Sequence, residues 1–319
     1  MALHLCYENY FELEVEAEAN LLKAYSDGGP RLLIGTFSLS NITEINCANN
    51  HLKRLPVFPE QLKKLNCSSN ELESLPKLPQ RLISLICSHN NLSQFPDLPE
   101  SLEVLSIHSN QIQIVPKLPS SLIDLTISSN PIQKLPKLPE FLKVLTCAGC
   151  QLKELPDLPI YLTVLWCPNN QLQKLPSLPD ILEELCCYEN VLQILPTLPN
   201  TLKYLFCYSN KLQFLPNLPK TLLQLECEYN QLSYLSKLPE LIELVCDHNP
   251  ILFIAPLAKR PNDYEVPDDL LQLHSTEHYP TYQKRYSVYH YLITFLVHAN
   301  VSPAVISNDS WWFPGIVEA

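Results

Sequence analysis

The sequence predicts a solenoid of stacked twenty-residue units, and three observations predict it. The template L-x-x-L-x-C-x-x-N-x-L-x-x-L-P-x-L-P-x-x recurs with a fixed period from Ile42 to about residue 249. Most of the 29 prolines fall at fixed positions of this template. Nine of the 12 cysteines share one further position. A strict period of this length is typical of chains in which each unit packs only on its neighbours. We count eleven units, the last of them one residue short.

Each unit is expected to contribute one short β-strand. In the unit that starts at Leu162, residues 164–166 form this strand, and their alternate side chains point to opposite sides. Stacked units then pair their strands in parallel and build a sheet on the concave face of the solenoid. The inward side chains expected in this unit are those of Leu162, Leu165, Cys167, Leu172, Leu175 and Leu178.

Two further positions determine the rest of the unit. Asn170 and its equivalents follow the strand, where a buried amide can bond backbone groups of adjacent coils. Cys150 alone breaks this asparagine ladder. In the L-P-x-L-P half, proline fixes φ and removes a donor, which favours extended or polyproline II backbone. The convex side is therefore predicted to be thin and nearly free of helix.

The repeats occupy residues 41–250, and residues 1–40 are predicted to form an N-terminal cap. Such a cap is needed because the first coil would otherwise expose an apolar end. Within it, residues 11–16 alternate apolar and acidic side chains as a strand does, and residues 17–25 have the composition of a helix. Residues 27–30, Asp-Gly-Gly-Pro, are expected to be a loop.

Residues 251–319 leave the repeat and are predicted to form a C-terminal cap with one amphipathic helix. That helix, over about residues 281–298, has Tyr282, Tyr286 and Tyr289 on one apolar face. We expect it to cover the open end of the last coil.

Composition excludes several partners. The formal charge of −11 opposes binding to phosphate backbones and to anionic membranes, so no nucleic acid is expected. No run of eighteen apolar residues is present, and the N-terminus lacks the pattern of a signal peptide. Ile107 and Ile127 stand at the cysteine position in two units, which indicates a small apolar site. The thiols are therefore predicted to be reduced and buried, as in the reducing cytosol.

The motif L-P-x-L-P within twenty-residue units, as in residues 135–139, resembles the LPX subfamily of bacterial leucine-rich repeats. The resemblance covers residues 42–250 and implies a leucine-rich-repeat solenoid, α/β by convention. The helical caps are predicted from the flanking residues themselves, because residues 1–40 show no clear match to the helical cap region of the family. It also implies an effector of the YopM-like or IpaH-like groups, delivered into a host cell by a system that needs no signal peptide. Ligase members of the family carry a large helical domain with a catalytic cysteine. Here the last cysteine is Cys246, inside the array, so this domain is not expected.

Candidate chemistry is sparse, and neither a metal nor a cofactor is predicted. Cys147 and Cys150 form a C-x-x-C motif, but Cys147 holds the core position and Cys150 the asparagine position. His89 and His108 are expected to lie close together on adjacent coils, as a solvated surface pair. We therefore expect the chain not to be an enzyme.

The outward strand positions change character from the seventh unit onward. Earlier units carry small or polar residues there, whereas later ones carry large aromatic rings among acids. Aromatic residues are frequent binding hot spots, and surrounding acids select a basic partner. The predicted partner-binding residues are Trp166, Tyr188, Tyr204, Phe206, Tyr208, Tyr229, Glu184, Glu226 and Glu228.

Three interpretations of this aromatic cluster remain open. The rings can bind a protein partner, stack across strands and only stabilise the sheet, or be covered by the C-terminal segment. The first interpretation predicts a non-enzymatic scaffold that binds a host protein through the C-terminal half of its concave face. The alternatives are a ubiquitin-pathway or other enzyme with its activity in residues 251–319, and a structural or sensor repeat protein.

Overall fold

The structure is a computed structural model that describes residues 2–4, 12–16, 21–26, 29–36, 42–235, 237–251 and 253–254. The chain divides into two compact bodies, Met1–Gln171 and Leu172–Ala319, which we call the N-terminal and C-terminal bodies. Each repeat unit is one coil, and each body is described by itself below.

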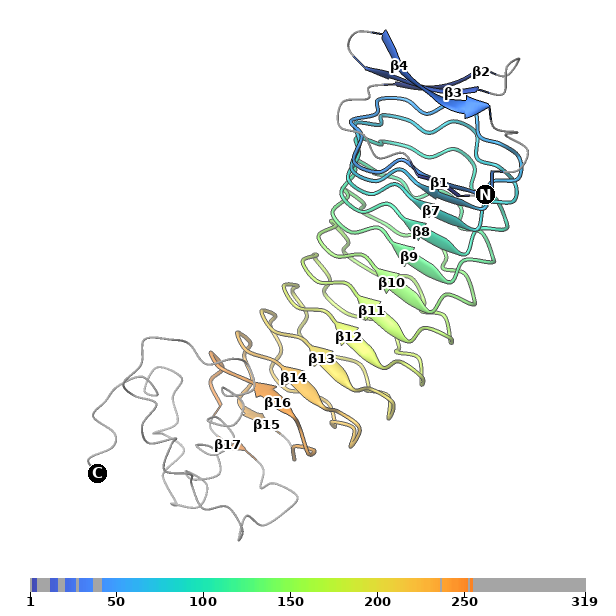
Figure 1. Cartoon of the computed structure of the whole chain (residues 1–319). Helices are drawn as coiled ribbons and strands as arrows, with labels where there is room; N and C mark the ends of the chain where they lie inside the picture. Colours follow the sequence, from blue (N-terminus) through green and yellow to red (C-terminus); the bar gives the residue numbers. More distant parts are fainter. Residues whose placement is uncertain are drawn as a thin grey trace, which may run out of the picture. The chain divides into compact units, whose positions relative to one another are not determined.

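The N-terminal body contains a parallel sheet in the order β1-β5-β6-β7-β8-β9-β10-β11 (Figure 1). Each repeat strand pairs with the strand twenty residues further on, as Leu105 pairs with Leu125. The strands are β1 Ala2–His4, β5 Glu44–Asn46, β6 Lys64–Asn66, β7 Ser84–Ile86, β8 Val104–Ser106, β9 Asp124–Thr126, β10 Val144–Thr146 and β11 Val164–Trp166.

The C-terminal body continues the same plan with a parallel sheet in the order β12-β13-β14-β16. These strands are β12 Glu184–Cys186, β13 Tyr204–Phe206, β14 Gln224–Glu226 and β16 Glu243–Val245. On the proline side of the coils, β15 (Tyr234–Leu235) pairs in parallel with β17 (Phe253–Ile254). Both bodies thus have the architecture of a leucine-rich-repeat solenoid, and the fold-class prediction is confirmed.

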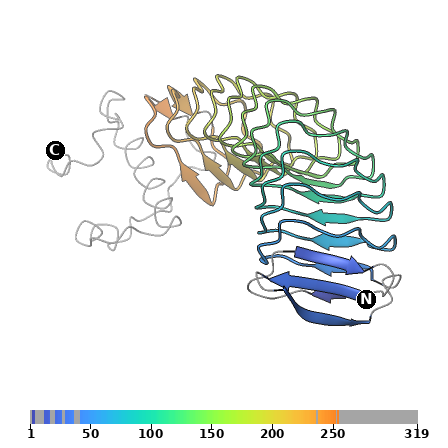
Figure 2. The same cartoon turned by 90° about the horizontal axis from the view of Figure 1, so that it is seen from above.

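Between β1 and the repeats, the chain forms a three-stranded antiparallel sheet made of β2 (Glu12–Glu16), β3 (Leu21–Ser26) and β4 (Gly29–Thr36) (Figures 1 and 2). The strand predicted around residues 11–16 is confirmed. The helix predicted over residues 17–25 is wrong from Leu21 onward, because β3 pairs on both sides. Helix propensity is a weak preference that such pairing overrides. Gly29 and Pro30 belong to β4 instead of the predicted loop.

The described residues contain no helix. The absence agrees with the predicted thin, extended convex side, where prolines alternate with leucines. The helix predicted over residues 281–298 lies outside the described residues. Among the described residues, no helix has the length and apolar character that a membrane crossing requires.

Leucines and cysteines from every coil fill the core. Leu162, Leu165, Cys167 and Leu172 are fully buried as predicted, whereas Leu178 is only partly buried. Burying one leucine side chain stabilises a fold by about 1.5–3 kcal/mol. The cysteines at the repeat position are free and buried in the described part of the chain, so the core position predicted for them is confirmed.

The asparagine ladder closes each coil onto the next. The Oδ1 atom of Asn90 accepts from the Leu72 backbone N–H at 3.0 Å, and its Nδ2 donates to the carbonyl of Cys67 at 3.0 Å. One side chain therefore satisfies a buried donor and a buried acceptor of the preceding coil. The residue just before each ladder position is left-handed, with φ between 50 and 60°, as for His89 at 55°.

Cys150 shows what the ladder does where the amide is missing. Its thiol has only long contacts with carbonyl oxygens, 3.6 Å to Ile127 and 3.7 Å to Ala148. The backbone N–H of Ile132 donates instead to the carbonyl of Asn130 at 2.8 Å. In this coil, the carbonyl oxygen of Asn130 therefore replaces the amide oxygen that an asparagine at position 150 would supply to the backbone N–H of Ile132.

Candidate partner-binding surface

The outward positions of β12, β13, β14 and β16 form a regular grid on the sheet face of the C-terminal body. The in-register pairs are Glu184 with Tyr204, Cys186 with Phe206, and Phe206 with Glu226. We call this surface the aromatic–acidic patch. It comprises Tyr188, Tyr204, Phe206, Tyr208, Glu184, Glu226, Glu228 and Glu243.

The aromatic half of the patch contains a stacked pair of rings. The rings of Tyr188 and Tyr208 lie with centroids 4.2 Å apart and an interplanar angle of 7°. Such cross-strand pairs stabilise a sheet, so stacking is part of what these rings do. Tyr204 and Phe206 have no such stacking partner in the described part of the chain. Structural stacking therefore accounts for only part of the aromatic cluster.

Tyr229 lies beside the patch and not on an outward strand position. It is the left-handed residue of its turn, with φ of 51°, and 54% of it is exposed. Its ring stacks on that of His248, with centroids 4.1 Å apart. His248 precedes Asn249 as Tyr229 precedes Asn230, and sequence reasoning did not single it out as a ring partner.

Trp166 belongs to the N-terminal body, at the outward end of β11, and 41% of it is exposed. It is in register with Thr146 of β10. The prediction that it faces solvent is confirmed, and it is described apart from the patch.

Cys186 occupies an outward strand position by the repeat pattern, yet it is only 5% exposed. It is a short side chain in register with the much longer Phe206. Burial, followed by the negative charges of Glu184 and Glu226, raises the pKa of its thiol to about 12. A thiol this difficult to ionise is a poor nucleophile.

The acidic half of the patch consists of carboxylates that the fold partly removes from water. Burial raises the pKa of Glu226, although the Nε2 atom of Gln224 donates to its Oε1 at 2.9 Å. Burial also raises the pKa of Glu228 to about 7, with further contributions from the charges of Glu226 and Asp247. The atoms Glu228 Oε2 and Glu243 Oε1 are buried without a hydrogen-bond partner in the described part of the chain. Unpaired buried carboxylate oxygens are costly and favour a cation beside them.

Replacing Glu228 by glutamine is expected to raise the free energy of unfolding by about 1–2 kcal/mol at pH 8, with little effect at pH 5. A carboxyl whose folded-state pKa is raised stabilises the protein below its ordinary pKa. That stability is lost as the pH rises through about 7, because the folded protein must then hold the buried charge. Urea unfolding at both pH values measures the difference. Glu189→Gln, at an exposed acid of the same body, is the control, and an equal effect of Glu228→Gln at both pH values contradicts the account.

The sheet face of the N-terminal body has a different character. Apart from Trp166, the outward positions of its strands carry polar or aliphatic residues, and the rings of His89 and His108 lie 4.6 Å apart, edge to face. The predicted proximity of these histidines is confirmed. Burial, followed by the charge of His89, lowers the pKa of His108. The hydroxyls of Ser88 and Ser106 lie 2.9 Å apart beside them.

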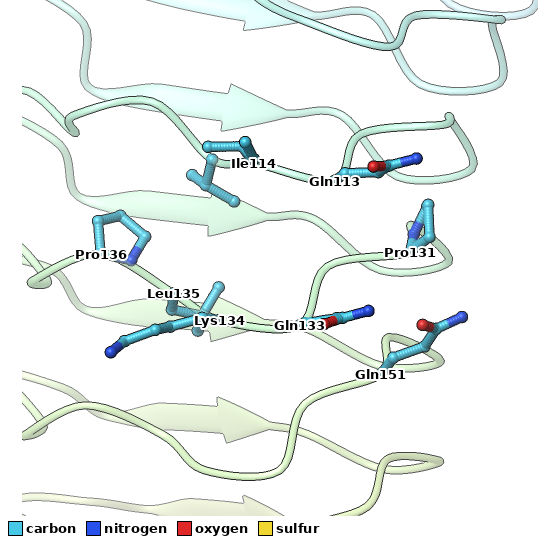
Figure 3. A pocket seen from close by; sticks show the side chains of 9 residues that line it. Gln113, Ile114, Pro131, Gln133, Lys134, Leu135, Pro136 and Gln151 are labelled. Atoms are coloured by element: carbon cyan, nitrogen blue, oxygen red, sulfur yellow. The ribbon is translucent and has the colours of Figure 1, made fainter.

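A groove of about 610 Å³ lies between coils on the strand-free side of the N-terminal body (Figure 3). Gln113, Gln133 and Gln151 lie at one end, and the apolar parts of Leu135 and Pro136 at the other. Lys134 alone of its lining residues is charged, so the groove lacks the paired acid and base of a hydrolytic site. The described residues also contain no group of three or more His, Cys, Asp and Glu side chains placed to hold a metal ion.

Solved structures of bacterial leucine-rich-repeat effectors are similar to this chain. YopM, a leucine-rich effector protein from Yersinia pestis, is 29% identical over 77% of this chain and 80% of its own, with a TM-score of 0.58. YopM from Yersinia enterocolitica WA-314 is 27% identical over 73% of this chain, with a TM-score of 0.53. The match spans 65% of that second protein.

The fold is also similar to that of the functional domain of InlJ from Listeria monocytogenes, which includes a cysteine ladder. The identity there is 24% over 69% of this chain and 54% of that one, with a TM-score of 0.61. No protein-family model matches the sequence, and no curated protein matches it. The similar structures are repeat scaffolds, a class of fold that by itself does not specify a function.

Proposed function

We propose that the chain is a non-enzymatic scaffold that binds a protein partner through the aromatic–acidic patch. The observation that carries the proposal is the juxtaposition, on one sheet face, of large rings and carboxylates whose buried oxygens have no partner among the described residues. Outward strand positions gain nothing from the core, so rings that do not stack there need another reason to be retained. Large aromatic residues are the side chains that most often dominate protein interfaces.

The partner that fits this patch has a basic surface. Glu184, Glu226, Glu228 and Glu243 supply negative charge, and the chain as a whole carries −11. The same field opposes nucleic acid and anionic membranes. The partner is therefore a protein, in our proposal one from a host cell.

An effector role supports this choice of partner. The chain is similar to YopM, which is a leucine-rich effector protein. Buried, free thiols suit the reducing cytosol, so we infer that the chain acts in the host cytoplasm. Delivery by a route that needs no signal peptide is part of the same proposal.

The alternative of an enzyme places activity in residues 251–319, almost all of which lie outside the described residues. The sheet face offers it no support, because Cys186 is buried and its pKa is raised. A structural or sensor role predicts that all the rings only stabilise the sheet by stacking across strands. Tyr204 and Phe206 have no stacking partner among the described residues, so they distinguish a binding role from a purely structural one. The third interpretation, in which the C-terminal segment covers the rings, also concerns residues that lie almost entirely outside the described part of the chain.

The test asks whether a protein partner that the wild-type chain captures is no longer bound when the aromatic rings of the patch are replaced by alanine. Full-length wild-type chain and a Phe206→Ala/Tyr208→Ala variant are used to capture proteins from a eukaryotic cell lysate. Proteins lost by the variant are then purified, and their affinity for both chains is measured. We expect a loss of about 30-fold or more, as truncation of a hot spot produces.

Two controls accompany this measurement. Phe214→Ala removes an exposed ring of the same body, 42% accessible, that lies on the other side of its coil, and it should bind as the wild type does. The Trp166→Ala variant tests separately whether the N-terminal body contributes to the affinity for the partner. Equal affinity of the wild type and the Phe206→Ala/Tyr208→Ala variant for every captured protein would sink the proposal.

A further inference from the structure

Glu226 and Glu228 lie two residues apart on the same side of one strand and its extension. The ladder continues past Glu226, because the Ser209 N–H donates to the Glu228 carbonyl at 2.9 Å. Residues two apart in extended backbone are separated by roughly 6–7 Å. A planar guanidinium group between two carboxylates at this spacing can donate to both.

The rings of Phe206 and Tyr208 flank this pair of acids on the neighbouring coil. Phe206 is in register with Glu226, and strands in a sheet lie about 4.8 Å apart. The arrangement therefore places aromatic surface next to carboxylate surface within the length of one side chain. A long basic side chain has a matching division, with an apolar stem and a charged head.

The two acids have no cation of their own in the described part of the chain. No ion pair among the described residues includes Glu226 or Glu228. Gln224 supplies Glu226 with one neutral donor, and Glu228 Oε2 has none. Burial raises the pKa of Glu228 to about 7, and the neighbouring charges of Glu226 and Asp247 add to this shift.

We propose that Glu226 and Glu228, together with the rings of Phe206 and Tyr208, form a recognition site for a single arginine side chain of the protein partner. The inference rests on the proposed function, because the arginine belongs to the protein that the patch binds. Arginine fits better than lysine for two reasons. Its five donors in a rigid plane serve two carboxylates at once, and its weakly hydrated plane stacks on aromatic rings.

The experiment measures binding of a small probe to the full-length chain. The probe is the peptide acetyl-Gly-Gly-Arg-Gly-Gly-amide, compared with peptides in which lysine or citrulline replaces the arginine. Binding is followed by changes in the tyrosine ring signals in NMR spectra. We expect the arginine peptide to bind at least fivefold more tightly than the lysine peptide, and the citrulline peptide not to saturate.

Two variants locate the binding. Glu226→Gln/Glu228→Gln keeps the size of both side chains and should weaken binding of the arginine peptide at least tenfold. Asp124→Asn changes a partly buried acid on the sheet face of the N-terminal body and should leave binding unchanged. Circular dichroism and urea unfolding confirm that both variants are folded.

The outcomes separate this inference from the proposed function. No saturable binding of the arginine peptide to the wild type, equal binding of the lysine and arginine peptides, or unchanged binding to Glu226→Gln/Glu228→Gln each overturns the arginine site. The proposed function survives any of these results if the Phe206→Ala/Tyr208→Ala variant still loses a captured partner. Conversely, peptide selectivity that depends on both acids supports the site even where that capture fails.

Discussion

Replacing Asn110 by alanine is expected to lower the free energy of unfolding by about 2–4 kcal/mol, because buried backbone groups lose their partners. The Oδ1 atom of Asn110 accepts from Leu92 N at 3.0 Å. Its Nδ2 atom donates to the carbonyls of Cys87 at 3.1 Å and Ile107 at 3.0 Å. Alanine leaves these groups in two coils unsatisfied at once. Urea unfolding followed by circular dichroism measures the loss.

Two matched variants test the cause of this effect. Gln111→Ala changes the adjacent exposed side chain and should alter stability little. Cys150→Asn restores the ladder where it is interrupted, and it should stabilise the protein by about 1 kcal/mol. A loss for Asn110→Ala no larger than that for Gln111→Ala would show that the ladder is dispensable.

The core thiols of the folded protein are expected to react with iodoacetamide about a thousandfold more slowly than those of the unfolded chain. Alkylation requires the thiolate. The pKa of Cys186, raised to about 12 mainly by burial, leaves roughly a thousandth of the ordinary thiolate fraction at pH 8. Burial raises the pKa of Cys147 and Cys187 well above the ordinary value as well.

Mass spectrometry of peptides after timed labelling measures each cysteine separately. The same digestion after labelling in urea supplies the reference rate for every site. Labelling of Cys186 or Cys187 in the folded protein at the rate seen in urea would contradict the burial of these two thiols. It would also remove the argument that places the chain in a reducing compartment.

The repeat core could be predicted from the sequence because its information is periodic. Each coil repeats the same spacing of leucine, cysteine and asparagine. The role of a position that is ambiguous in one unit can therefore be assigned from the equivalent position in the other units. The strand around residues 164–166 and the burial of Leu165 and Cys167 follow directly from that spacing. The role of Asn170 also follows, since its half-buried amide after the strand bonds backbone groups of the preceding coil.

The features that sequence reasoning missed depend on neighbours that no period specifies. Residues 21–26 have helix-compatible composition, and only pairing with two other strands makes them β3. Cys186 is on an outward position by pattern, yet the size of adjacent side chains decides that it is buried. The stacking of Tyr229 on His248 requires the register of the shortened last unit. In each case the observed structure is determined by a contact between particular side chains or strands, and not by the secondary-structure propensity of the residues themselves.

The shortened last unit shows where the length of a coil is free to change. In an ordinary unit, Leu222 N donates to the carbonyl of Pro219 at 3.1 Å, three residues earlier. In the last unit, Leu241 N donates to Pro239, two residues earlier, at 3.0 Å. The segment from strand to asparagine keeps its length, since Asn249 still reaches the carbonyl of Cys246 at 3.1 Å. In this coil the missing residue is therefore taken from the turn that enters the strand, while the turn that leaves it keeps its length and its hydrogen bond.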